Sequence, residues 1–418
     1  MKNLFLCLIA AAILGACQSN KAPDSQVSTE GQYIIGKLDS LHSDILDETR
    51  NIWVHVPGNQ VDGIYGQLKY PVLFVLDGPD HFHALTGIIK QLSGNSISPE
   101  MVVVSIPNTD RTRDLTPTHV DVAFGDSAFV RTSGGGDDFL AFMGEELIPY
   151  IESKYPVTSY RSFVGHSFGG LAVIHALFSQ TQLFSAYVAI DPSLWWDDWM
   201  IPKMTDSVLT HVDLSDKALF VGVANTMEEG MVVEEVRKDT AESSNHIRSI
   251  LSFLDIAGSD NASGLTLGWD YYKDDDHGSV PLITEYDALR FLFSWYRLEG
   301  LSDFFLPDSD KSAEDLIALL STHYDQVSKH FGYEVLPPEA TINSLGYNFM
   351  QSKPEFAYAL FDLNLRNYPQ SANVFDSMGD YYLAQSDTLL AVEHFRKAYE
   401  IGESPLTKEK MDALEKTE

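Results

Sequence analysis

Cysteine is almost absent from this sequence of 418 residues, because the chain contains two, Cys7 and Cys17, and both lie near the N-terminus. The rest of the chain therefore has no disulfide, no thiol nucleophile and no cysteine metal site. Covalent chemistry in the folded part must depend on serine, histidine and carboxylate side chains.

Positive charge is also scarce, since 28 basic residues stand against 60 acidic ones and the net charge is −32. Nothing in such a chain would offset repulsion by a phosphate backbone, so we exclude nucleic acid as a partner. The excess of acidic residues indicates a well-solvated surface.

Long hydrophobic runs are lacking too, because the apolar stretch 4–14 is well short of the roughly 20 residues that cross a membrane. It is typical of a removable export signal and ends in LGAC, which resembles the lipobox of bacterial lipoproteins, in which the cysteine is lipidated. An incidental Cys17 after an ordinary signal is the alternative. We expect a signal over 1–17, a flexible tether over 18–30, and a lipid anchor in the bacterial envelope, at the outer membrane facing periplasm or exterior.

Short apolar runs alternate with amphipathic segments through residues 31–300, which predicts an α/β domain. Most of these runs are continuous, as in strands that are buried on both faces of a mostly parallel sheet. We expect strands at 51–56, 71–76, 101–106, 187–191, 218–224 and 265–273, and helical segments at 138–152 and 231–254.

Residues 312–418 are typical of helices alone. Gly346 recurs as Gly379 and Phe361 as Phe395, an offset of 33 to 34 residues. Small residues let paired helices approach closely while larger ones fill the gap between them, and the pattern resembles a tetratricopeptide repeat. We expect a helical-repeat domain that packs on the α/β domain and offers a surface to a protein partner, with an unrelated helical tail as the alternative.

The pentapeptide G-x-S-x-G spans residues 165–169, between a short strand and an apolar helix. Small residues are needed there because a sharp strand-to-helix turn lifts the serine hydroxyl out of the sheet. We therefore predict that Ser167 is a nucleophile and that the backbone N–H of Phe168, at the helix N-terminus, donates to an oxyanion.

Two later histidines, His246 and His277, are the candidates for the general base. His246 lies within an amphipathic helical pattern beside Ile247 and Ile250, which favours a surface or packing role. His277 follows a strand and three aspartates and precedes Gly278, so we predict that a loop brings it to the serine as the base.

A carboxylate must orient the base and stabilise its imidazolium form. The turn after the strand 218–224 offers Glu228, our first choice, and Glu229, our second. Asp191, at the end of the preceding strand, is the rival, and we expect it to shape the substrate pocket instead.

Several further stretches accompany the nucleophile and the base. Together with them, the chain resembles, over residues 32–297, the esterase family of α/β-hydrolases that contains enterochelin esterases, feruloyl esterases, esterase D and the mycolyltransferases. The supporting stretches are 50–54 (RNIWV), 76–78 (LDG), 111–116 (RTRDLT), 146–151 (ELIPYI), 165–170 (GHSFGG), 192–196 (PSLWW) and 277–281 (HGSVP).

The resemblance implies an α/β-hydrolase fold in which the loop after Leu76-Asp77-Gly78 supplies a second oxyanion donor. The next residue is Pro79, which has no N–H, so the donor would be Asp80 or Gly78. Arg111 and Arg113 either bind an anionic group of the substrate or form a structural pair. Trp195 and Trp196 either line the site as an apolar wall or belong to the core.

These features predict a serine esterase that forms an acyl-enzyme and needs no metal or organic cofactor. The substrate would be a small-molecule ester, or an ester of the glycan or siderophore type. The alternatives are an acyltransferase of the same fold, and an inactive hydrolase scaffold that acts as a surface binding module.

Overall fold

The computed structural model describes residues 33–58, 69–260, 262–306 and 308–415. The predicted export signal, the predicted lipidation site and the predicted tether lie outside these residues. None of the helices in the described ranges combines the length and the apolar character needed to span a bilayer.

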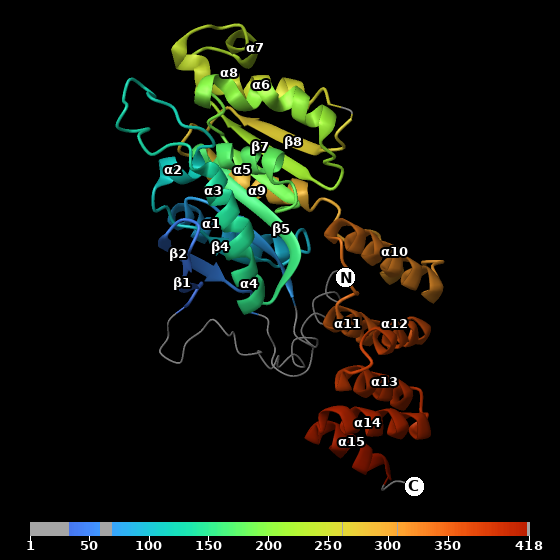
Figure 1. Cartoon of the computed structure of the whole chain (residues 1–418). Helices are drawn as coiled ribbons and strands as arrows, with labels where there is room; N and C mark the ends of the chain where they lie inside the picture. Colours follow the sequence, from blue (N-terminus) through green and yellow to red (C-terminus); the bar gives the residue numbers. More distant parts are fainter. Residues whose placement is uncertain (1–32, 59–68, 261, 307, 416–418) are drawn as a thin grey trace, which may run out of the picture.

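An eight-stranded sheet forms the centre of the α/β part (Figure 1). Its strands are β1 (Lys37–Ser43), β2 (Glu48–His55), β3 (Tyr70–Val75), β4 (Val102–Ser105), β5 (Val157–His166), β6 (Ala186–Ile190), β7 (Ala218–Ala224) and β8 (Thr266–Tyr272). Their order is β1-β2-β4-β3-β5-β6-β7-β8. Strand β2 pairs antiparallel with both β1 and β4, and all the other neighbouring strands pair in parallel. The predicted strands are confirmed, and the edge strand β1 was not predicted.

Helices cover both faces of the sheet, because alternate residues of each buried strand point to opposite sides. Phe74 of β3 joins the cluster on one face, and its neighbours Leu73 and Val75 join the cluster on the other. The first face carries α3 (Gly136–Ala141), a π-helical turn (Phe142–Leu147), α4 (Ile148–Lys154), α5 (Phe168–Ser179), α6 (Trp196–His211) and α8 (Asn245–Ala257). The second carries α1 (Gly78–Ser93) and α9 (Val280–Leu292).

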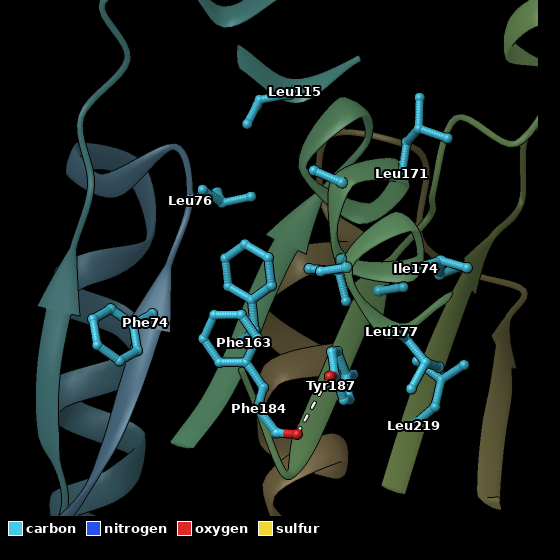
Figure 2. Packing of buried hydrophobic residues seen from close by; sticks show 14 of the residues in the cluster. Phe74, Leu76, Leu115, Phe163, Leu171, Ile174, Leu177, Phe184, Tyr187 and Leu219 are labelled. Carbon is cyan, nitrogen blue, oxygen red and sulfur yellow. Dashed lines mark hydrogen bonds between the residues drawn. The ribbon is translucent and has the colours of Figure 1, made fainter. Parts of the chain in front are cut away.

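Figure 2 shows the first cluster at the centre of the sheet, where Leu171, Ile174 and Leu177 of α5 lie over Phe163 and its neighbours. The rings of Phe163 and Phe184 stack at 4.5 Å. This packing fixes α5 against β5, and therefore fixes the turn that joins them.

One predicted helical segment is divided in the structure. Residues 231–254 were expected to form one amphipathic segment, but they contain the short α7 (Val233–Val236), a loop, a 3₁₀ turn (Glu242–Ser244) and then α8. The loop lets α8 begin beside the carboxyl edge of the sheet.

The C-terminal region is all helical and extends away from the sheet in Figure 1. Its helices are α10 (Ala313–Phe331), α11 (Glu339–Phe349), α12 (Pro354–Asn367), α13 (Ala372–Ala384), α14 (Thr388–Gly402) and α15 (Pro405–Glu415). A side chain at Gly346 or Gly379 would meet the ring of Phe361 or Phe395 respectively, so the two helix pairs share the same close contact. The tetratricopeptide assignment stays a prediction.

Helix α10 joins the two parts of the chain. Leu316 and Leu320 belong to the apolar cluster of the helical region. Val327 and Phe331 belong instead to the apolar cluster on the second face of the sheet, which also carries α1 and α9. The Phe331 ring packs edge-on against Tyr160 at 5.0 Å.

We predict that Phe331→Ala lowers the free energy of unfolding by about 3 kcal/mol or more, because it removes a buried ring and leaves a cavity. Denaturant unfolding measures the loss. Leu389→Ala is the control, since that side chain is 73% exposed and its truncation should change stability by no more than about 0.5 kcal/mol. Equal losses for the two variants would contradict the docking role of α10.

Candidate active site

Ser167 occupies a strained turn between β5 and α5, with φ 60° and ψ −114°. A side chain at Gly165 would overlap the backbone of Gly169, and one at Gly170 would lie 2.8 Å from Pro192. The close approach of these backbones explains the glycines on both sides of the serine, and it lifts the hydroxyl above the carboxyl edge of the sheet.

A buried carboxylate lies beside this turn, at the end of β6. Asp191 is fully buried, and its Oδ2 accepts hydrogen bonds from His277 Nδ1 at 2.6 Å and from His246 Nε2 at 2.8 Å. Its Oδ1 accepts from the Ala224 N–H at 3.0 Å. Burial would raise the pKa of Asp191, but these hydrogen bonds outweigh it and hold the pKa well below its ordinary value.

The structure places a different carboxylate beside His277 from the one that we predicted. Glu228 is exposed and accepts a hydrogen bond from Ser243 Oγ at 2.9 Å, and Glu229 is exposed as well. Asp191, which we expected to shape the pocket, contacts His277 instead. The turn after β7 leaves Glu228 and Glu229 exposed, whereas β6 pairs directly with β5, with Ile190 opposite His166, and ends level with the serine.

His246 is the second correction. The prediction of a helix was right, but the first turn of α8 points this imidazole at Asp191 instead of at solvent or the apolar core. The ligand atoms of Asp191, His246 and His277 lie within 4.8 Å of one another, so these three could hold a metal ion. Without a metal ion, these ligand atoms are already joined by the two hydrogen bonds from the imidazoles to Asp191 Oδ2.

Ser167 has one neighbour that the sequence did not point out as a partner, and His277 has another. Ser167 Oγ lies 3.2 Å from the Oγ of the buried Ser193. The ring of His277 lies 4.5 Å from that of His166, the residue before the serine. No hydrogen bond joins Ser167 to His277 within the described residues, as in many ligand-free sites, where such bonds form only with substrate.

The three backbone N–H groups that we predicted as oxyanion donors differ in whether they are already paired. Phe168 is the first residue of α5, so its N–H has no acceptor within the helix. The N–H of Asp80 donates to the Asp77 carbonyl at 3.1 Å, and that of Gly78 donates to the Ile106 carbonyl at 3.1 Å. Neither of the two predicted second donors is therefore free in this conformation.

Arg111 lies at the site but is held by a carboxylate. Its Nε and Nη2 donate to Asp77 at 2.6 and 2.9 Å, and Nη2 also donates to the carbonyl of His166 at 3.0 Å. Burial would raise the pKa of Asp77, but the hydrogen bonds and charge of Arg111 keep it below its ordinary value. Arg113 pairs with Glu48 and Asp114 and is structural.

A polar cavity of about 570 Å³ opens next to the serine turn. Its walls come from α1, α9, the loop after β4 and the end of β5, and include Asp77, Asp80, His81, Asn108, Arg111, His166, Ser279 and Glu285. His81 Nδ1 lies 2.5 Å from Glu285 Oε1 in a fully buried pair.

Burial lowers the pKa of His166 to about 4, with His277 and His81 adding to the effect.

Aromatic side chains form the opposite side of the turn. Trp196 is buried and its Nε1 donates to Thr118, so it belongs to the core. Trp195 is half-buried, and its ring lies 4.8 Å from that of Phe124, which is 79% exposed. Phe129 stacks on Phe168 at 6.0 Å. Of the two tryptophans, Trp195 is the one placed to meet a ligand.

The mostly parallel sheet, the strained serine turn and the carboxylate-bound imidazole at its carboxyl edge define an α/β-hydrolase. The chain belongs to the putative esterase family, whose model matches residues 43–244. A solved structure described as an IroE-like serine hydrolase from Shewanella oneidensis is 31% identical, with a TM-score of 0.65, and the match covers 79% of this chain and 99% of that one. The family predicted from the sequence is confirmed.

Curated relatives match a shorter stretch. The siderophore triacetylfusarinine C esterase of Aspergillus fumigatus is 28% identical over 158 residues, 36% of this chain and 53% of its own length. The ferri-bacillibactin esterase of Bacillus subtilis is 29% identical over 151 residues, 33% of this chain and 52% of its own length. The chain therefore spans about half the length of these relatives.

We predict that Gly165→Ala destabilises the protein by about 1–3 kcal/mol, because the new methyl group overlaps the facing backbone. Gly169→Ala is the matched control. A side chain there would lie 3.4 Å or more from its neighbours, so stability should change by less than about 1 kcal/mol. Equal denaturant midpoints for the two variants would show that the turn tolerates a side chain at both positions.

Proposed function

We propose that this protein is a serine esterase in which Ser167, His277 and Asp191 form the catalytic triad. The observation that carries the proposal is the hydrogen bond of the buried Asp191 to His277 Nδ1, at the edge of the sheet where the strained serine turn lies. A carboxylate so placed has the role of the triad acid, which orients the imidazole and stabilises its charged form.

The proposed proton transfers follow from the acceptor role of Asp191. Because Asp191 is an acceptor, Nδ1 of His277 carries a proton and Nε2 is free to act as base. His277 Nε2 takes the hydroxyl proton as Ser167 Oγ attacks the ester carbonyl, and the Phe168 N–H donates to the resulting oxyanion. The imidazolium then gives its proton to the leaving alcohol, and water hydrolyses the acyl-enzyme by the same steps in reverse.

We propose a siderophore-type ester as substrate, as the names of the curated relatives suggest. The two sides of the turn support this class. The cavity offers hydrogen-bonding groups, whereas Trp195, Phe124 and Phe129 offer exposed aromatic surface. An ester that joins a polar, amide-rich part to a flat ring would meet suitable surfaces on both sides.

Ser167→Ala should abolish hydrolysis of a panel of short-chain, aromatic and siderophore-type esters while leaving the fold intact. Loss of a triad nucleophile typically lowers kcat by about 10⁴ to 10⁶. Ester cleavage followed by chromatography measures the loss, and circular dichroism checks the fold. Full activity in the folded variant would end the serine-esterase proposal.

Asp191→Asn should lower kcat by about 10² to 10⁴, because the amide can neither hold the required tautomer nor stabilise the imidazolium. Glu228→Gln is the matched control. It also removes one carboxylate charge near the site, but from an exposed side chain that bonds only to a serine hydroxyl, so kcat should change less than about twofold. The opposite ranking of the two variants would restore Glu228 as the acid.

A further inference from the structure

The carboxylate of Asp191 has an unusual distribution of donors. Both imidazoles, His277 and His246, donate to the same oxygen, Oδ2, while Oδ1 is occupied by the Ala224 N–H. The two rings meet edge to face, with centroids 5.1 Å apart and planes at 88°. His246 therefore competes with the proposed base for one buried charge.

The position of His246 is firmly held. Ile247 and Ile250, on the same helix, are fully buried in the core above the sheet. The preceding residue, Asn245, accepts a hydrogen bond from Trp199 Nε1 at 2.8 Å, and Ser249 Oγ donates to the carbonyl of His246 at 2.6 Å. The backbone of His246 therefore cannot shift away from Asp191 without disturbing the start of α8.

We propose that His246 is a positioning residue that tunes the proposed base by sharing the acceptor oxygen of Asp191. A carboxylate oxygen that accepts two N–H groups stabilises the charge of each less than it would stabilise one alone. In the free enzyme, His277 is therefore held in its working tautomer, but its charged form receives only part of the stabilisation that Asp191 would give to a single imidazole. The inference rests on the proposed function.

Other titratable groups face these rings as well. His166 lies beside His277 from the end of β5, and Asp276 belongs to the same loop as His277. Burial keeps the pKa of His166 at about 4, so it stays neutral near neutral pH. Hydrogen bonds from the Ser279 and Gly278 N–H groups hold the pKa of Asp276 below its ordinary value, so it stays charged. Neither His166 nor Asp276 changes charge near neutral pH.

The test is the pH dependence of Ser167 modification by a fluorophosphonate, which reports the base without knowledge of the natural ester. His246→Ala should move the acid limb of this profile upward by about one pH unit, because Asp191 then serves His277 alone. His246→Gln should restore the wild-type limb to within about 0.3 unit, since the Gln amide keeps an N–H donor near the position of Nε2. His211→Ala, which removes an exposed histidine of α6, should leave the limb unchanged.

The outcomes separate this inference from the proposed function. No labelling of the wild-type protein would refute the serine-esterase proposal. Labelling with an unmoved limb in His246→Ala, or with equal shifts in His246→Ala and His246→Gln, would overturn the role of His246.

A second readout does not depend on catalysis. NMR titration of the Cε1–H signal of His277, assigned by its loss in His277→Gln, should show the same upward shift in His246→Ala. His246→Ser takes the place of His246→Ala if that variant unfolds. An unchanged titration midpoint in a folded variant would also overturn the proposal.

Discussion

The negative charge buried at Asp191 is the constraint on which the carboxyl edge of the sheet depends. A buried carboxylate without partners costs several kcal/mol, so the fold must bring donors to it. The donors are the N–H of Ala224 on β7, His246 on α8 and His277 on the loop after β8. Three segments that are distant in the sequence are thus held in register by one side chain, and the site is assembled by the same interactions that satisfy the charge.

A second set of ion pairs fixes the wall of the cavity that contains Arg111 and Asp77. Arg50 is fully buried and donates to Asp114, which also accepts from Arg113. This anchors α2 (Arg111–Leu115) to β2, and α2 in turn presents Arg111 to Asp77 at the end of β3. Although the chain has few basic residues, three of them, Arg50, Arg111 and Arg113, form ion pairs in this wall. Arg111 is therefore a structural group first, and only its remaining exposed surface is offered to a ligand.

The sequence was sufficient to predict the features that depend on residues close together in the chain. The buried strands are continuous apolar runs, and the serine turn needs its glycines for steric reasons within a few residues, so both could be predicted. The proposed triad acid could not be predicted, because the strand order decides which strand end lies beside Ser167. Asp191 and Glu228 both follow apolar strands, and only the sheet shows that β6 is the neighbour of β5.

Other residues around Asp191 and Ser167 were also missed, because their contacts join segments that are distant in the sequence. His246 fits a helical apolar pattern, and the helix exists, but periodicity does not reveal that its first turn begins at the edge of the sheet. Ser193 lies in the stretch 192–196 that supports the family resemblance, but nothing in the sequence marked it as a partner of Ser167, because that contact arises only when the loop after β6 folds back over the turn. For Trp195 and Trp196, burial in the fold separated two residues that the sequence left equivalent.

Charge balance at the site has a consequence for recognition, because the protein as a whole is strongly acidic. Asp77 is neutralised by Arg111, and the pair of His81 and Glu285 has no net charge whichever partner holds the shared proton. The buried part of the cavity next to the serine therefore presents hydrogen-bonding groups without the negative field of the surrounding surface. The ester substrate that we propose, if it is rich in carbonyl and hydroxyl oxygens, would be bound there through hydrogen bonds and not through charge.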